Sequence, residues 1–560
     1  MNRNIALLIL VLLLCIGTVL PLLHSGFFDV HDNTQVVRVY EMGKMLAQKT
    51  FPVRWVPDLG YGYGYPIFNF YGPLPYYIGG VVTLLGINAL ISTKIMLGVG
   101  ILLSAVTMFI FSRKFFGDVG GVVSAIVYSY FPYHAVNIYV RGAVGELFAY
   151  AFLPLIFYGI YSFIEDRKKF AMKEFLIMSY GVLLVATSHN LTFFMLLIIM
   201  VPTTLLAYFF AKYRKYFAIA VVGALLVGVA LSAFYIVPAF LEMKYTNVAS
   251  QIGGGANFRD HFVCLGQYWD SLWGFGGSVK GCIDGLSFKA GKLNILLLIV
   301  SMLFLVYSFG KKKIDLQEKV VVISIVLVVI STVLTLSITA MIWGAVPFME
   351  YIQYPWRFIN FTALFTAFVI GYIPYFVAKK QNNAVALYIS ICIIVGSIIL
   401  GIKLFTPQYF NSNSSSYYTS QKYINFTVSK ISDEYLPSGF IKPMGPSDLF
   451  ERDIELYQGM GSLRFEMKKF QYYIVDYDLA ENGIVHLNRA YYPSWEAKIN
   501  GKQIPIVDDK KGVNMEIPKG KGVLEIELKN TPLQSVANMI SLIVFLSLPT
   551  AIIILSRRKK

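Results

Sequence analysis

The chain has 560 residues, of which 56% are hydrophobic and 14% charged, and its mean hydropathy is +0.61. Because soluble domains carry about 25% charged residues, this composition excludes an ordinary soluble protein. The formal net charge is +16, but many basic residues stand in short clusters between apolar runs. That distribution favours membrane topology over nucleic-acid binding as its cause. We therefore predict a polytopic α-helical membrane protein without a nucleic-acid partner.

Twelve apolar runs are long enough to predict membrane-spanning helices. They cover residues 5–23, 92–112, 119–136, 146–164, 173–188, 190–210, 217–239, 293–309, 319–341, 358–377, 385–404 and 534–555. The first run is long for a signal peptide and no small-residue cleavage pattern follows it, so we expect it to be retained. Residues 76–86 are apolar but short, and Gly79-Gly80 interrupts them. We expect an interfacial or re-entrant helix there, on the outer side.

Basic clusters predict the orientation, because cytoplasmic loops of membrane proteins are enriched in Lys and Arg. The clusters are Arg113-Lys114, Arg167-Lys168-Lys169, Lys212 with Arg214-Lys215, Lys311-Lys312-Lys313, Lys379-Lys380 and Arg557-Arg558-Lys559-Lys560. All fall on one side if both termini are cytoplasmic and the protein is a multi-pass component of the cytoplasmic membrane. The segments 24–91, 241–292, 342–357 and 405–533 then face outward.

Residues 405–533 differ from the rest of the chain, because they are polar and begin with the linker-like run 411–416. Apolar and polar residues alternate at 463–467 and again at 523–528, as in half-buried strands. Asn500-Gly501 lies between strand-like runs and is a strong hairpin signal. We predict a transmembrane domain at 1–404, an extracytoplasmic β-rich, sandwich-like domain at 405–533, and a last helix with a basic cytoplasmic tail at 534–560.

The first outer loop begins with two carboxylates and an imidazole directly after the first span, at Asp29, His31 and Asp32. An aspartate there is suited to accept a proton from an attacking hydroxyl, or to hold a divalent cation. The alternative is structural: Asp32 or Asn33 caps the helix that runs to Met45.

Further along this loop, Arg54 is a candidate partner for a phosphate or for Asp58. The run Gly60 to Pro66, which contains Tyr65, offers hydroxyls and ring faces for a saccharide or a lipid headgroup. Its alternative role is an aromatic belt at the membrane interface.

Three further polar clusters fall at predicted outer turns. Arg141 and Arg357 are candidates to bind a lipid phosphate, since a guanidinium matches phosphate geometry. Glu146 has the alternative role of neutralising Arg141, and Arg357 that of reaching to the interface. His189 is either a ligand-binding residue or a hydrogen-bonded structural one.

Cys264 and Cys282 share one predicted outer loop, where a disulfide forms if that side of the membrane is oxidising. Cys15 and Cys392 lie in apolar runs and are expected to be packing residues. The sequence contains neither a phosphate-binding loop of the G-x-x-x-x-G-K-[ST] type nor a dinucleotide fingerprint nor a His-Glu-x-x-His motif. An enzyme without a nucleotide site that works at the outer face needs a substrate carried there, and lipid-linked sugars meet that need.

Several motifs follow one another in an order that resembles membrane proteins labelled "6-pyruvoyl-tetrahydropterin synthase-related" and, more distantly, the YfhO family. They are His31-Asp32, Pro52 to Trp55, Gly64 to Pro66, Phe70 to Leu74, Arg141 to Glu146, Ser188 to Asn190, Tyr354 to Phe358, Glu434 to Pro437 and Tyr491 to Trp495. Both families look like members of the GT-C class of membrane glycosyltransferases. The resemblance implies a polyprenyl-phosphate sugar donor and an acidic base in the first outer loop. Here His31-Asp32 occupies the place where two adjacent carboxylates often stand.

The sequence therefore favours sugar transfer from a polyprenyl-phosphate carrier to an envelope glycan, lipid or protein. Asp32 is the expected base, and Asp29 is the alternative base or a metal ligand. Arg141, Arg357, Arg54 and His189 are expected to bind the donor, with His31, Glu146 and Tyr65 in support. A transporter or flippase of a lipid-linked precursor is an alternative, although polar residues gather at one face and no inverted repeat is evident. A non-catalytic envelope scaffold that binds glycan through the β-rich domain is the other.

The predicted orientation is testable by labelling single engineered cysteines in intact cells with a membrane-impermeant reagent. We expect a cysteine at position 500 to react and a cysteine at position 168 to stay protected until the cells are opened. Labelling at 168 without labelling at 500 contradicts the whole scheme, because all the basic clusters would then have to face outward.

Overall fold

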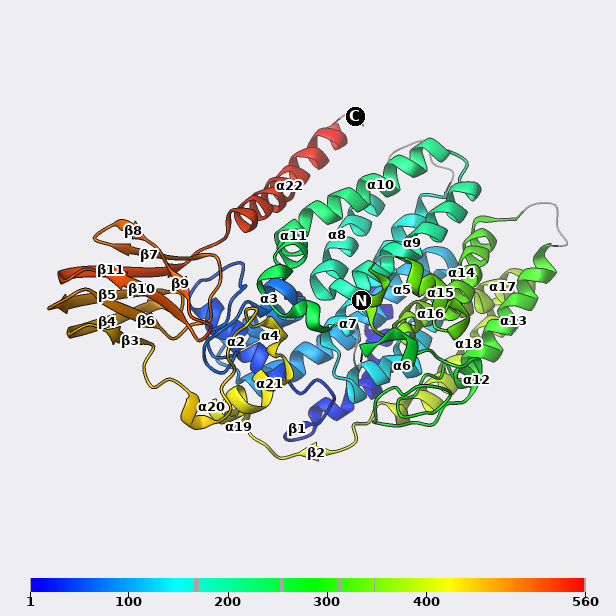
Figure 1. The fold of residues 1–560 in the computed structure, drawn as a ribbon. Helices are drawn as coiled ribbons and strands as arrows, with labels where there is room; N and C mark the ends of the chain where they lie inside the picture. Colours follow the sequence, from blue (N-terminus) through cyan, green and yellow to red (C-terminus); the bar gives the residue numbers. More distant parts are fainter. Residues whose placement is uncertain (1, 166–170, 252–255, 310–313, 347, 558–560) are drawn as a thin grey trace.

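The computed structural model describes residues 2–165, 171–251, 256–309, 314–346 and 348–557. The basic triplets 167–169 and 311–313 and the last residues 558–560 lie outside the described residues. Figure 1 shows a large bundle of helices with a β-rich part at one end, and the last helix, α22, running back from that part along the bundle. The predicted architecture of a polytopic helical protein with a C-terminal β-rich region is confirmed.

Nine helical segments within the described residues are long and apolar enough to cross a membrane. They are Ala89–Ser129 (α5), Val144–Ser162 (α7), Asn190–Phe210 (α9), Arg214–Leu231 (α10), Lys292–Phe309 (α13), Leu316–Val333 (α14), Pro355–Lys380, Asn383–Leu404 and Pro532–Pro549. Pro355–Lys380 contains α16 (Ile359–Ile370) and α17 (Tyr372–Lys380), Asn383–Leu404 contains α18 (Asn383–Gly401), and Pro532–Pro549 belongs to α22 (Pro532–Arg557).

Each of the twelve predicted spans overlaps a helix, but not one to one. α5 contains the predicted span 92–112 and residues 119–129 of the next, because the chain reverses at Gly117, whose φ is +71°. A Cβ on Gly121 would lie 2.9 Å from Cβ of Arg113, which is the close approach expected across a tight helical hairpin. Two other predicted spans fall on the shorter helices α1 (Arg3–Leu14) and α8 (Met172–Ser188). Beyond Leu14, the first predicted span continues as two short 3₁₀ turns rather than as α-helix.

The first outer loop contains three helices and packs on the bundle. It contains α2 (Gln35–Ala47), α3 (Ile67–Phe70) and α4 (Leu74–Leu84). The apolar segment 76–86 thus lies in an 11-residue helix, which is too short to cross a bilayer. The other short helices are α6 (Pro132–Ala135), α11 (Ala233–Leu241), α12 (Leu265–Trp269), α15 (Ala340–Ala345), α19 (Ser415–Tyr418), α20 (Gln421–Tyr423) and α21 (Ser429–Ile431).

The β-rich part consists of two antiparallel sheets with strand orders β3-β6-β10-β9 and β4-β5-β11-β7-β8. The strands are β3 (Ile454–Gln458), β4 (Gly461–Lys469), β5 (Tyr472–Leu479), β6 (Gly483–Leu487), β7 (Trp495–Ile499), β8 (Lys502–Ile504), β9 (Val507–Asp508), β10 (Val513–Ile517) and β11 (Gly520–Leu528). Alternate side chains of β5 and β10 are buried, so each sheet contributes one face to a shared core. Asn500 and Gly501 form the β7–β8 turn with φ of +48° and +82°, which confirms the predicted hairpin.

The segment before the sandwich is not a free linker. Phe410–Asn411 (β2) pairs with Phe27–Phe28 (β1), so the start of the outer region is joined to the end of the first predicted span. The hydroxyl of Tyr423 donates to the backbone oxygen of Asn33 over 3.2 Å. These contacts attach residues 405–450 to the loop that contains the candidate carboxylates.

A buried carboxylate joins the helical bundle, the first loop, the sandwich and α22. Glu242 accepts hydrogen bonds from Asn69 (2.9 Å), Tyr492 (2.7 Å), Thr531 (2.5 Å) and Gln534 (2.8 Å). A buried donor without an acceptor lowers the stability of the fold, so the pairing of these four donors depends on Glu242.

We expect Glu242→Leu to destabilise the protein by about 3 kcal/mol or more, because it leaves four buried donors without their shared acceptor. The measurement is the thermal midpoint of the detergent-solubilised full chain, followed by the loss of its monodisperse size-exclusion peak. Glu242→Gln keeps one acceptor oxygen and is the matched control, with a smaller expected loss. Equal midpoints for the wild type and the leucine variant would contradict this account.

Candidate functional site

A cavity of about 340 Å³ brings together residues from four separate segments of the chain. Asp32 comes from the turn before α2, Arg141 from the turn before α7, and Arg357 from the 3₁₀ helix that leads into α16. The loop between α11 and α13 provides one wall. The lining residues are His31, Asp32, Arg141, His261, Gly277, Ser278, Leu286, Tyr354, Trp356 and Arg357.

Backbone pairing holds Asp32 next to Arg141. The amide of His31 donates to the carbonyl of Val140, and the amide of Asp32 donates to the carbonyl of Arg141, both over 3.0 Å. Asp32 is therefore fixed by its main chain, and its side chain is left to face the cavity. Within the described residues its carboxylate has no hydrogen-bond partner.

The structure contradicts the helix-capping alternative for this turn. Thr34 is the N-cap residue of α2, and no side chain caps that helix. Asn33 instead accepts a hydrogen bond from the amide of Val30 over 3.0 Å. Because the Asp32 carboxylate does not cap α2, it is free to act on a ligand.

Burial raises the pKa of Asp32 above its usual range, while Arg141, Arg38 and Arg357 oppose that shift. A carboxylate with a raised pKa binds a proton more readily than an exposed one, which suits a general base. The neighbouring guanidinium groups keep the ionised form accessible. Arg38, on α2, was not among the residues singled out from the sequence, because its proximity to Asp32 appears only in the fold.

Glu146 lies between the two arginines of the cavity. Its Oε2 is 2.8 Å from Nη1 of Arg141 and 3.7 Å from Nε of Arg357. Tyr133 and Asn360 donate to its other oxygen over 2.9 and 2.7 Å. Glu146 is 1% exposed, so it is a structural counter-charge and not a ligand-facing group.

The hydrogen bonds of both arginines use Nη1 alone. Arg141 donates to Asn137 and Glu146, and Arg357 donates to the carbonyl of Ile352 over 2.7 Å. Each guanidinium also lies over a ring: Arg141 is 4.5 Å from Trp356 and Arg357 is 5.0 Å from Tyr354. Among the described residues, Nη2 of each arginine has no hydrogen-bond partner. These groups are thus positioned to donate to an anion.

The candidate carboxylates do not assemble a metal site. Asp29 is exposed and accepts a hydrogen bond from Asn411 over 3.1 Å, away from the cavity that Asp32 lines. Within the described part of the chain, no group of three or more His, Cys, Asp or Glu side chains is arranged to hold a metal ion. The residues present therefore do not fit a divalent cation held jointly by Asp29 and Asp32.

Three predicted donor-binding or supporting residues lie elsewhere. Arg54 bonds to Asn69, to the carbonyl of Phe234 and to Asn538 in a second cavity. The alternative pairing of Arg54 with Asp58 is wrong, because Asp58 bonds to Lys44.

The other two have structural contacts. His189 caps α9 by accepting from the amide of Thr192 over 3.2 Å. Tyr65 is fully buried and bonds to the hydroxyl of Ser432 over 3.0 Å. His31 lines the cavity rim, where its Nε2 lies 2.8 Å from the carbonyl oxygen of Phe275.

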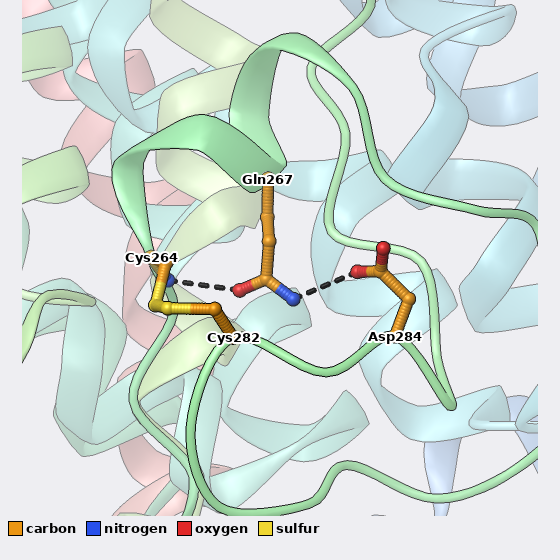
Figure 2. The surroundings of a disulfide bond; sticks show 4 residues. All are labelled: Cys264, Gln267, Cys282 and Asp284. Carbon is orange, nitrogen blue, oxygen red and sulfur yellow. Dashed lines mark hydrogen bonds between the residues drawn. A yellow bond between two sulfur atoms is a disulfide. The ribbon is translucent and has the colours of Figure 1, made fainter.

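A disulfide organises the loop that forms the cavity wall. Cys264 and Cys282 are joined, with Cα atoms 5.5 Å apart. Figure 2 shows the side chain of Gln267 between the disulfide and Asp284. Its amide oxygen accepts a hydrogen bond from the backbone amide of Cys264, and its amide nitrogen donates one to the carboxylate of Asp284. His261, which precedes Cys264, and Ser278, which precedes Cys282, have their Nδ1 and Oγ atoms 2.7 Å apart, and both residues line the cavity.

A family model described as "6-pyruvoyl-tetrahydropterin synthase related domain; membrane protein" matches residues 68–404. Among curated proteins no match is found. The solved structures that are similar include the apo oligosaccharyltransferase of Archaeoglobus fulgidus, with 13% identity, a TM-score of 0.47, and 81% of this chain and 62% of that chain covered.

Two further solved structures are similar to this chain. For the arabinofuranosyltransferase AftD from Mycobacteria the values are 12% identity, a TM-score of 0.47, and coverage of 75% and 28%. For ArnT from Cupriavidus metallidurans bound to undecaprenyl phosphate they are 11%, 0.35, and 77% of each chain. This chain thus spans less than two thirds of the length of the first two.

We expect Cys264 and Cys282 to resist alkylation until the purified protein is reduced, as read by mass spectrometry of the peptides. The double variant Cys264→Ser/Cys282→Ser should increase trypsin cleavage after Lys280, because the loop loses a constraint worth about 3 kcal/mol. Cys15→Ser, in the bundle, is the control and should leave cleavage unchanged. Two thiols that react fully without reduction would exclude the bridge.

Proposed function

The chain belongs to the family of membrane proteins described as 6-pyruvoyl-tetrahydropterin synthase related, and from that premise we propose that it is a glycosyltransferase that moves a sugar from a polyprenyl-phosphate carrier to an envelope acceptor. The observation that supports this proposal is one cavity lined by a carboxylate without a partner and by two arginines. A base and an anion-binding pair in one cavity are the groups that sugar transfer from a phosphate carrier requires.

In the proposed reaction, Asp32 removes the proton of an acceptor hydroxyl. The oxygen of that hydroxyl forms a bond to the anomeric carbon of the sugar, and the bond from that carbon to the phosphate oxygen breaks. The lipid phosphate leaves with the electron pair, and the proton stays on Asp32 until solvent takes it. Arg141 and Arg357 stabilise the charge that grows on the phosphate.

We also propose that the disulfide-bridged loop helps to exclude water from the cavity. His261 and Ser278 cover one side of the cavity, and Trp356 and Tyr354 cover another. Walls of this kind exclude water, which would otherwise compete with the acceptor for the sugar and weaken the electrostatic interactions. Ring faces at Trp356 and Tyr354 are suited to stack on a sugar, although both already contact the arginines.

We expect Asp32→Asn to lower glycosyl transfer by ~10²–10⁴-fold, because it removes the base but keeps the shape of the side chain. The measurement is the mass spectrum of envelope glycolipids and glycans from a deletion strain that expresses each variant. The wild-type spectrum should contain a species that is one sugar heavier than the corresponding species in the spectrum of the variant. Asp29→Asn is the matched control, and we expect it to keep activity.

The same proposal predicts the pH dependence. Since the pKa of Asp32 is raised, activity should fall as the pH drops through that raised pKa, above the range of an ordinary aspartate. Full activity in Asp32→Asn, Asp29→Asn and the double variant would exclude the enzymatic role of this loop and favour the scaffold hypothesis.

A further inference from the structure

A third cavity, of about 210 Å³, lies where α13 begins and α18 ends, next to the last turn of α5. We call Lys289, Lys292, Lys403, Asp270 and Trp269 its rim; the other lining residues are apolar residues in or next to the three helices, together with the polar Asn294 and Ser397. It shares no lining residue with the cavity at Asp32. The rim is therefore charged, and the rest of the lining is mainly apolar.

The rim has an excess of positive charge. Asp270 pairs with Lys292 over 2.7 Å, whereas Lys289 and Lys403 have no carboxylate partner within the described residues. Burial lowers the pKa of Lys289, Asp270 opposes that shift, and Lys403 and Lys292 add to it. The lysines thus repel one another unless an anion lies between them.

The backbone adds to this charge. α13 begins at Lys292, and the first amide groups of a helix have no intrahelical acceptors and carry partial positive charge. Ser397, 6% exposed, also lines the cavity with a hydroxyl that lacks a hydrogen-bond partner in the described part of the chain. Several donors of different kinds thus surround one small space.

Below the rim the two helices present apolar side chains to the bilayer. Leu296 on α13 and Leu400 on α18 are each 51% exposed in the protein alone. The helices come close at this level, because a Cβ on Gly396 would lie 3.3 Å from Leu293. Exposed apolar side chains thus continue from the charged rim along two membrane-spanning helices. Trp269, 43% exposed at the rim, is the residue type that favours the interface.

We propose that this cavity binds the headgroup of an anionic phospholipid, with the phosphate between Lys289, Lys403 and the start of α13 and the acyl chains along α13 and α18. The charged rim matches a phosphate, and the apolar helix faces match acyl chains. A free phosphate shares the first of these features but not the second. The site shares no lining residue with the proposed donor site, so the two proposals are tested independently.

The test measures binding of dioleoyl phosphatidylglycerol to the purified full-length protein in detergent by native mass spectrometry. We expect Lys289→Gln/Lys403→Gln to weaken that binding roughly 30-fold, since each lysine near a lipid phosphate contributes about fivefold. Lys289→Arg/Lys403→Arg keeps both charges and should retain binding. Lys502→Gln/Lys519→Gln makes the same charge change on the β-rich part and should have no effect.

Two further probes separate the sources of phosphate. Dioleoyl phosphatidylcholine should bind more weakly than phosphatidylglycerol, and millimolar inorganic phosphate should not displace the lipid. Arg141→Gln, which alters the proposed donor site, should leave phosphatidylglycerol binding unchanged. Unchanged phosphatidylglycerol affinity in Lys289→Gln/Lys403→Gln, with the variant still monodisperse, would overturn the proposal, as would full displacement by inorganic phosphate.

Discussion

Glu146 is the counter-charge on which the candidate site depends. It is 1% exposed and touches Arg141 at 2.8 Å and Arg357 at 3.7 Å. Two guanidinium groups buried among apolar helices would be unstable without a carboxylate, and breaking such a pair typically costs 3–5 kcal/mol. One carboxylate between two arginines still leaves an excess of positive charge. That excess is directed into the cavity, because both arginines line it and Glu146 does not.

The other parts of the site are attached to this centre through the backbone. The amides of His31 and Asp32 bond to residues 140–141, so the turn that contains the base is held by the same segment as Arg141. The start of the outer region then pairs with Phe27–Phe28. Glu242 joins the sandwich and the last helix to the first loop through Tyr492, Gln534 and Asn69. Two buried carboxylates, one at the site and one at the junction, thus connect segments that are far apart in the sequence.

Features that depend on local sequence were predictable, and features that depend on distant contacts were not. Apolar length located the helices, and Asn500-Gly501 located a hairpin, since both signals are contained in a few residues. Arg141, Arg357 and Asp32 were each singled out from the sequence, and the fold brings them together. Two of the three partners of Arg54 are the carbonyl of Phe234 and Asn538, and no pattern near residue 54 indicates them. The reversal at Gly117 falls between the predicted spans 92–112 and 119–136, so the boundary between them was placed correctly.

The charge balance of the cavity explains why Asp32 rather than Asp29 is suited to act as the base. Arg141 and Arg357 carry two positive charges, and Glu146 offsets one of them. Asp32 offsets the other, so these four side chains together are close to neutral. A lipid phosphate would add negative charge beside Asp32, and a like charge favours the protonated form of a carboxyl group. Proton transfer from the acceptor to Asp32 therefore becomes more favourable once the donor phosphate is bound. Asp29, exposed and bonded to Asn411, lacks both the burial and the arginines that would make it respond in this way.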